Sequence, residues 1–161
     1  MGFWPAYSEE LISKYQPAEV LRRLSIAVKP AKIQPYHNER LHGAASDIFL
    51  FNGLVSKKGF SISKVVERPN NFLPLINGKV VMQNDGSRIK MQYSLFKSVN
   101  YSLAFWFFLL IGFTLISIIE NKTASWIVIP IVIQVGSYAL VVSRFKQAVL
   151  VSRRELVKLL L

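Results

Sequence analysis

Two long apolar stretches near the C-terminal end constrain the fold of this chain more than any other feature. Residues 99–119 and 126–142 contain no Asp, Glu, Lys or Arg, and the polar segment 120–125 separates them. As α-helices rising about 1.5 Å per residue they would be about 31 and about 26 Å long, close to the roughly 30 Å of a bilayer's hydrocarbon core. A helix in a soluble core rarely stays apolar on every face for that length. The pattern predicts a transmembrane hairpin with spans at about 99–119 and 126–143.

The chain is strongly basic, and its charges lie on both sides of the predicted hairpin. Its 161 residues include 20 Lys and Arg against 9 Asp and Glu, a formal net charge of +11. Lys97 and Arg144 flank the hairpin, so the positive-inside rule places both termini in the cytoplasm and the 120–125 turn outside. Basic residues near the surface also attract anionic headgroups. We therefore expect a multi-pass protein of the bacterial inner membrane, with the bilayer rather than nucleic acid as its partner.

The rest of the composition limits the classes of protein that need consideration. The chain has no cysteine, which excludes disulfides and thiolate metal sites. Residues 1–11 lack a basic stretch followed by an apolar one, so no cleavable signal peptide is predicted. The residues before the hairpin are enough for one small extramembrane domain.

The chain divides into four segments. Residues 1–46 are expected to be an N-terminal arm with a short amphipathic helix at 17–28, which has proline and glutamate in its first turn. Residues 47–96 form a cytoplasmic β-domain and residues 97–143 the hairpin. Residues 144–161 are predicted to be a basic amphipathic helix, because apolar residues recur there at intervals of three to four.

Alternating apolar and polar side chains mark the strands of the β-domain. They favour strands at 48–54, 60–67, 73–83 and 89–95, with a strong turn signal at 84–87. We expect a four-stranded antiparallel meander with one apolar face, which leads directly into the first transmembrane helix. Edge strands need cover, and the two amphipathic helices are available for it. The predicted fold class is α+β: a small meander, a two-helix transmembrane hairpin and a C-terminal amphipathic helix.

The run Arg68-Pro69-Asn70-Asn71-Phe72-Leu73-Pro74-Leu75-Ile76-Asn77-Gly78, followed by the hairpin, resembles a group of small bacterial two-span membrane proteins. Those proteins share an R-N-S-F-L-P-x-I-x-G type motif before a hydrophobic hairpin. The resemblance covers roughly residues 48–160, and Asn71 stands where serine is usual. It implies this architecture and a bacterial origin, and it implies no activity.

The sequence carries little sign of catalysis. Its two histidines, His37 and His42, lie on either side of Glu39 in a segment with two prolines that is expected to be a loop. A metal site needs three or four converging ligands. Loop histidines without a role are the favoured interpretation, and no metal or cofactor is predicted. No G-x-S-x-G, G-x-x-x-x-G-K-[ST] or G-x-G-x-x-G motif occurs. An enzyme is therefore the weaker class, and no catalytic residue is predicted.

The best candidate for a specific polar site is the cluster Arg68, Asn70 and Asn71, between two predicted strands. Its donors could hold a headgroup, a nucleotide or a peptide carboxylate. The alternative is structural: the two asparagines cap turns while Arg68 pairs with Glu67 or Asp85. The structural alternative is favoured.

Within the spans, one amide and two glycines suggest a surface for helix association. Gln134 needs a hydrogen-bond partner in hydrocarbon, either inside its own helix or in a second copy of the chain. Gly112 and Gly136 would allow close approach between helices. Tyr101 and Trp126 lie at opposite ends of the spans and fit interfacial anchors.

These features favour a non-enzymatic binding, sensor or effector module that is anchored in the membrane and self-associates through the hairpin. An unidentified protein partner fits the same interpretation. The alternatives are a pore-forming or immunity-type membrane protein and, less favoured, a lipid-acting enzyme that depends on His37, His42 or Arg68. The absence of an ionisable residue within the spans argues against ion-coupled transport.

Overall fold

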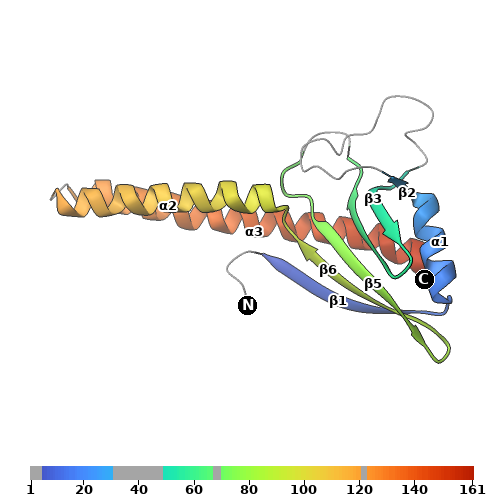
Figure 1. Cartoon of the computed structure of the whole chain (residues 1–161). Helices are drawn as coiled ribbons and strands as arrows, with labels where there is room; N and C mark the ends of the chain where they lie inside the picture. Colours follow the sequence, from blue (N-terminus) through green and yellow to red (C-terminus); the bar gives the residue numbers. More distant parts are fainter. Residues whose placement is uncertain (1–4, 31–48, 67–69, 121–122) are drawn as a thin grey trace.

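The computed structural model describes residues 5–30, 49–66, 70–120 and 123–161. Within these ranges the chain is α+β, with one six-stranded sheet and two long apolar helices (Figure 1). The elements, in chain order, are β1 (Ala6–Ser13), α1 (Pro17–Ala27), β2 (Val28–Pro30), β3 (Phe51–Ser56), β4 (Gly59–Lys64), β5 (Leu75–Gln83), β6 (Gly86–Ser94), α2 (Lys97–Ile119) and α3 (Ala124–Leu160).

The strands lie in the order β1-β6-β5-β4-β3-β2, so the predicted meander of four strands, β3 to β6, forms the middle of the sheet. All neighbours are antiparallel except the short β2, which runs parallel to β3. The prediction of four strands in all is therefore wrong: β1 and β2 extend the sheet at its two edges.

Strand β1 was not predicted from the sequence because it turns two polar side chains toward the interior. Leu11 is the apolar member of the inward set, and Glu9 and Ser13 are its neighbours on that face. Their partners come from the far end of the chain: the Ser13 hydroxyl donates a hydrogen bond to the carbonyl of Leu160 at 2.6 Å. A local pattern cannot show such partners, so the usual sign of a strand was missing.

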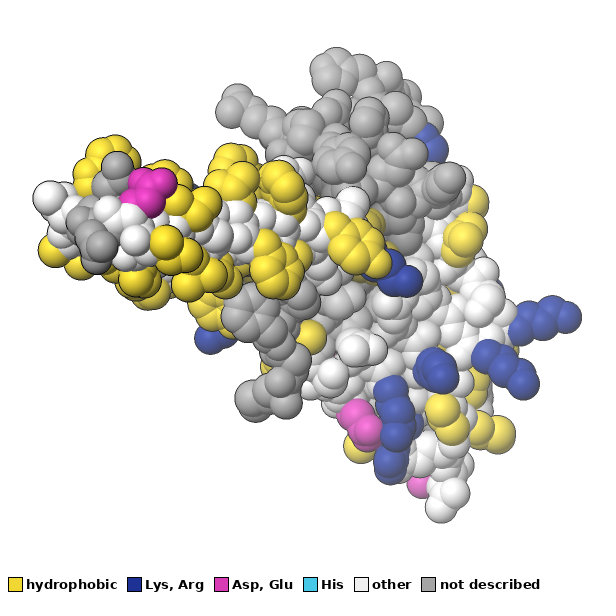
Figure 2. Space-filling view, turned by 60° about the vertical axis from the view of Figure 1, so that its left-hand side comes forward, with side chains coloured by type: hydrophobic (Ala, Val, Ile, Leu, Met, Phe, Trp, Pro, Cys, Tyr) yellow, Lys and Arg dark blue, Asp and Glu magenta, His cyan; other side chains and the backbone are white. Residues whose placement is uncertain are grey.

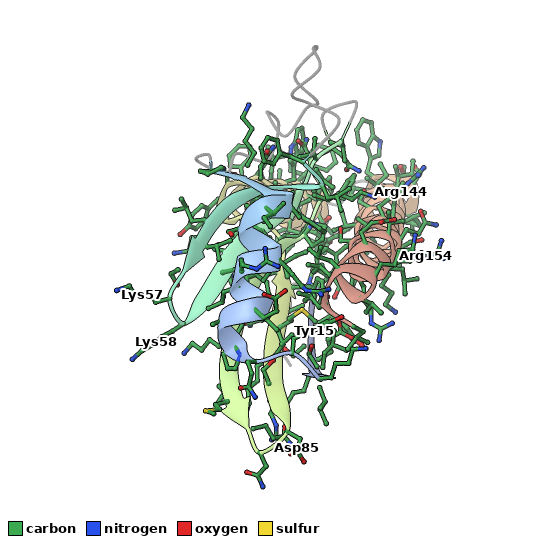
Figure 3. The ribbon with its side chains drawn as sticks, turned by 90° about the vertical axis from the view of Figure 1, so that its right-hand side faces the viewer. Tyr15, Lys57, Lys58, Asp85, Arg144 and Arg154 are labelled. Carbon is green, nitrogen blue, oxygen red and sulfur yellow. The ribbon has the colours of Figure 1, made fainter. Side chains whose placement is uncertain are left out.

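One face of the sheet carries the hydrophobic core, and two helices cover it. Val20 and Leu24 of α1 are fully buried, as are Leu156 and Leu160 near the end of α3. The helix predicted at 17–28 is α1, which ends at Ala27, and the one predicted at 144–161 is the C-terminal part of α3, which ends at Leu160. Both pack on the face of the sheet rather than along its edges (Figures 1 and 3). The prediction of a helix at each of these places is confirmed.

Two local arrangements support this part of the fold, one within α1 and one between β4 and β5. In the first turn of α1, Glu19 accepts hydrogen bonds from Arg22 at 2.8 Å and Arg23 at 2.9 Å, and these arginines lower the pKa of Glu19 from 4.5 to about 2. In the sheet, the Phe60 ring of β4 packs over Gly78 of β5. A Cβ at position 78 would lie 2.1 Å from that ring, so the position requires glycine.

The second predicted span and the C-terminal amphipathic helix are one continuous helix, α3, of 37 residues. Its C-terminal half packs on the sheet, while its apolar N-terminal half projects from the domain beside α2 (Figure 1). Both α2 and α3 are long and apolar enough to cross a membrane. The core helix of a soluble protein would be largely buried, whereas Val99 and Ser117 are the buried residues of α2. The space-filling view shows hydrophobic side chains covering this projecting hairpin (Figure 2).

Candidate functional site

The open face of the sheet, opposite α1 and α3, holds a hollow of about 940 Å³. Outward-facing side chains reach it from five strands, because alternate residues of a strand point to opposite faces. Strand pairing aligns them in two rows, which we call the amide row and the lysine row. The amide row consists of Ser8, Gln92, Asn77, Ser61 and Leu54. The lysine row consists of Glu10, Lys90, Lys79, Gly59 and Ser56.

The lysine row concentrates positive charge at the centre of the hollow. Lys79 and Lys90 are direct cross-strand partners, an arrangement in which like charges repel. Glu10 pairs with Lys90 at 3.1 Å and with Arg88 at 3.6 Å, so one carboxylate is shared between two cations. Lys79 makes no ion pair within the described ranges. Lys58 also lines the hollow and adds a further positive charge.

This basic character is visible on the surface. Lysine and arginine side chains spread over the sheet domain in the space-filling view, with few acidic side chains among them (Figure 2). Lys57 and Lys58, at the β3–β4 turn, extend from the side of the sheet that lies away from α3 (Figure 3). The arrangement suits binding of an anionic group.

A second polar cluster lies on the covered side of the sheet, where β1 meets α3. Glu9 accepts a hydrogen bond from the Tyr93 hydroxyl at 2.7 Å and pairs with Nε of Arg153 at 2.6 Å. The Glu9 side chain is 8% exposed and Tyr93 is fully buried. Burial, and then the hydrogen bond to Glu9, raises the pKa of Tyr93, while the Glu9 carboxylate raises the pKa of Arg153. The cluster therefore ties β1 to α3 through a buried acceptor.

Beside this cluster, a groove of about 540 Å³ separates the start of β1 from the middle of α3. Residues 5–7 form one wall, and a strip of α3 from Tyr138 to Arg153 forms the other. Most of the strip is apolar, and Lys146 and Arg153 are its charged members. The two elements that form its walls, the start of β1 and the middle of α3, lie at the base of the projecting hairpin (Figure 1).

Of the predicted polar site, Asn70 and Asn71 line neither the hollow nor the groove. Arg68 lies outside the described residues, as do His37, Glu39 and His42. Asn70 and Asn71 are exposed, and Asn70 accepts a hydrogen bond through Oδ1 from the backbone N–H of Phe72 at 2.9 Å. For Asn70 this is the turn-capping alternative.

The hairpin residues that were predicted to mediate association lie on different surfaces. Gln134 is half-buried, four residues before Tyr138, whose ring contacts Phe107 of α2 at 6.2 Å between centroids. Gln134 therefore lies on the side of α3 that faces α2. Gly112 and Gly136 face open space, because a Cβ at either position meets no atom within 4 Å. Self-association through these residues stays a prediction.

The predicted interfacial anchors are exposed near the two ends of the hairpin. Tyr101, near its start, is 73% exposed. Trp126, at the start of α3, is 53% exposed, and its ring lies 6.1 Å from that of Phe113. Lys97 is the first residue of α2, and Arg144 projects from the outer side of α3 (Figure 3).

Sequence reasoning missed the residues of both sites, although one signal could have found the hollow. The two-residue turn at Asn84-Asp85 fixes the register of β5 and β6, and that register pairs Lys79 with Lys90 and Asn77 with Gln92. The cluster around Glu9 has no such local signal. Its members are separated by 84 and 144 positions along the chain.

Comparisons with protein-family models, with curated proteins and with solved structures found no match for this chain. Among the described residues, no group of three or more His, Cys, Asp or Glu side chains could hold a metal ion. Function must therefore be argued from the geometry of the hollow, the groove and the hairpin.

Proposed function

We propose that this chain is a membrane-anchored binding module. In the proposal, α2 and the apolar half of α3 insert into the bacterial inner membrane, with both termini in the cytoplasm. The sheet domain then holds an acidic segment of a cytoplasmic partner protein in the hollow on its open face. The exposed apolar surface of the hairpin supports insertion, since water would solvate it poorly. The basic residues at its base support the orientation.

The observation that carries the binding role is the direct pairing of Lys79 with Lys90. Like charges opposite each other destabilise a sheet by a few tenths of a kcal/mol to about 1 kcal/mol. Glu10 relieves this repulsion in part, through its 3.1 Å contact with Lys90. A carboxylate from a ligand would relieve it further and would gain two charge-assisted hydrogen bonds.

The shape of the hollow favours an extended segment over a small molecule. Its two rows cross five strands, which at about 4.8 Å between strands is about 19 Å, the length of roughly six extended residues. The amide row adds Asn77 and Gln92, whose side chains can both donate to and accept from a peptide backbone. Lysines beside amides therefore match acidic side chains beside a peptide backbone.

The binding role is tested with the full chain in nanodiscs of neutral lipid and a fluorescent hexaglutamate peptide as the probe. We expect the double substitution Lys79→Gln with Lys90→Gln to weaken binding about tenfold or more, because each charge-assisted hydrogen bond contributes roughly 1.5–3 kcal/mol. Lys57→Gln is the matched control, since Lys57 lies next to the hollow without lining it. Equal binding by wild type and double variant, or equal binding of hexalysine, would refute the role.

The anchoring role is tested separately, and the absence of cysteine makes single-cysteine labelling direct. In intact cells, a membrane-impermeant maleimide should label Ser125→Cys at the hairpin tip but not Ser56→Cys in the sheet domain. Lysis should expose Ser56→Cys. The reverse labelling pattern would refute the orientation, and release of the protein by alkaline carbonate would refute insertion.

A further inference from the structure

We propose that the groove between the start of β1 and α3 binds an anionic phospholipid of the inner leaflet, with the headgroup at Lys146 and the acyl chain along the apolar residues of α3 on the membrane side of Lys146. This proposal rests on the membrane insertion proposed above. It concerns the covered side of the domain, whereas the hollow for the acidic segment lies on the open face of the sheet.

The groove extends along α3 from the predicted span into the sheet domain. Its α3 wall runs from Tyr138 to Arg153, which is about 22 Å at 1.5 Å per residue. Tyr138 and Val142 belong to the predicted span, whereas Lys146 and Arg153 lie beyond it. One continuous groove thus runs from the level of the hydrocarbon core to the level of the headgroups.

The side chains that line the groove differ along its length. Tyr138, Val142 and Phe145 line the groove on the membrane side of Lys146, whereas Val149, Leu150 and Arg153 line it on the side away from the membrane. This order matches a phospholipid, whose anionic phosphate lies outside its acyl chains. A volume of about 540 Å³ lies within the range of about 300–1,000 Å³ that is usual for small-molecule sites.

The two cations have different roles because Glu9 contacts only one of them. Arg153 is 41% exposed and pairs with Glu9, which fixes the guanidinium at the wall of the groove and offsets part of its charge. Lys146 is exposed and makes no ion pair with any residue in the described ranges. Lys146 is therefore the main contact for a phosphate, and Arg153 contributes through its remaining N–H groups.

Charge complementarity and continuity with the bilayer select this occupant over others. A soluble anion would leave the apolar strip uncovered, and a neutral lipid would leave Lys146 without a counter-charge. Basic residues near an anionic membrane surface attract its headgroups in general. A groove in which Glu9 holds Arg153 in one position should in addition select anionic lipids over neutral ones.

Native mass spectrometry of the full chain, released from mixed phosphatidylglycerol and phosphatidylcholine bilayers, tests the site. Wild type should retain one phosphatidylglycerol in preference to phosphatidylcholine. We expect Lys146→Gln to lower this retention about fivefold or more. Arg144→Gln is the matched control, because Arg144 lies two residues earlier on α3 at the same membrane surface and does not line the groove. It should retain the lipid as wild type does.

A second measurement does not depend on how the variants fold. Photoreactive phosphatidylglycerol in wild-type bilayers should crosslink to the segment 138–153 of α3 more than to α2. Uniform crosslinking over the hairpin, equal retention of the two lipids, or equal losses in Lys146→Gln and Arg144→Gln would each overturn the proposal. Failure of the proposed membrane insertion would be recognised separately, because alkaline carbonate would then release the protein from the membrane.

Discussion

Removal of the Glu9 carboxylate should detach β1 from the rest of the fold. Glu9→Ala leaves the buried Tyr93 hydroxyl without its 2.7 Å acceptor, which costs about 1–3 kcal/mol. It also removes the ion pair with Arg153. Because Arg153 is 41% exposed and water can solvate it, that loss is at most about 1 kcal/mol. The expected destabilisation of the β1 docking is therefore about 1–4 kcal/mol.

Hydrogen exchange measures this loss in the full chain. β1 is an edge strand, so its amides exchange when the strand opens locally and need not await global unfolding. A loss of 2 kcal/mol should speed exchange over Ala6–Ser13 about 30-fold, since each 1.4 kcal/mol is a factor of ten. Exchange over β4 and β5, in the middle of the sheet, should change little.

Two further variants test whether the unpaired Tyr93 hydroxyl causes the loss of β1 stability. Glu9→Gln keeps an acceptor for the Tyr93 hydroxyl and should cost about 1 kcal/mol or less. In a Tyr93→Phe background no hydroxyl remains to be left unpaired, so Glu9→Ala should then cost only about 1 kcal/mol. An undiminished effect in that background would refute the reasoning, because it would show that the hydroxyl has no part in it.

Two other substitutions and one titration test the packing and the charges. Gly78→Ala places a Cβ 2.1 Å from the ring above it and should destabilise the domain by about 1–3 kcal/mol in denaturant unfolding. Gly112→Ala, where the Cβ meets nothing within 4 Å, should not destabilise, and equal losses in the two variants would contradict the packing. The Glu19 carboxyl should titrate near pH 2 by NMR. Because its folded pKa lies below the ordinary 4.5, its stabilisation of α1 is complete above pH 4.5 and lost as the pH falls toward 2; replacing both arginine partners with glutamine should return the midpoint to about 4.5.

The parts of the fold that follow from local patterns could be predicted from the sequence. Residues 51–94 alternate apolar and polar side chains around clear turns, and they form the four central strands. The apolar length of 99–119 and the recurrence of apolar residues at intervals of three to four after position 144 likewise predict helices, and α2 and α3 contain them. In each case the signal lies within the segment that folds.

The parts that could not be predicted depend on contacts between distant segments. β1 turns Glu9 and Ser13 inward, and both side chains find their partners on α3, more than 140 positions away. β2 has three residues and forms only because β3 offers it an edge. The lysine row depends on strand pairing too, although a single hairpin turn fixes the pairing of Lys79 with Lys90.

β1 links the two proposed sites because its successive residues point to opposite faces of the sheet. Glu10 reaches the lysine row on the open face, and Glu9 reaches Arg153 at the wall of the groove. If a ligand in one site orders β1, a ligand in the other site no longer has to order that strand and therefore binds more tightly. The coupling between the two binding affinities must be reciprocal. Glu9→Ala, which frees the strand, should then weaken binding of hexaglutamate although the Glu9 carboxylate contacts Tyr93 and Arg153 on the covered side. Unchanged peptide binding in a variant with fast β1 exchange would show that the two faces act independently.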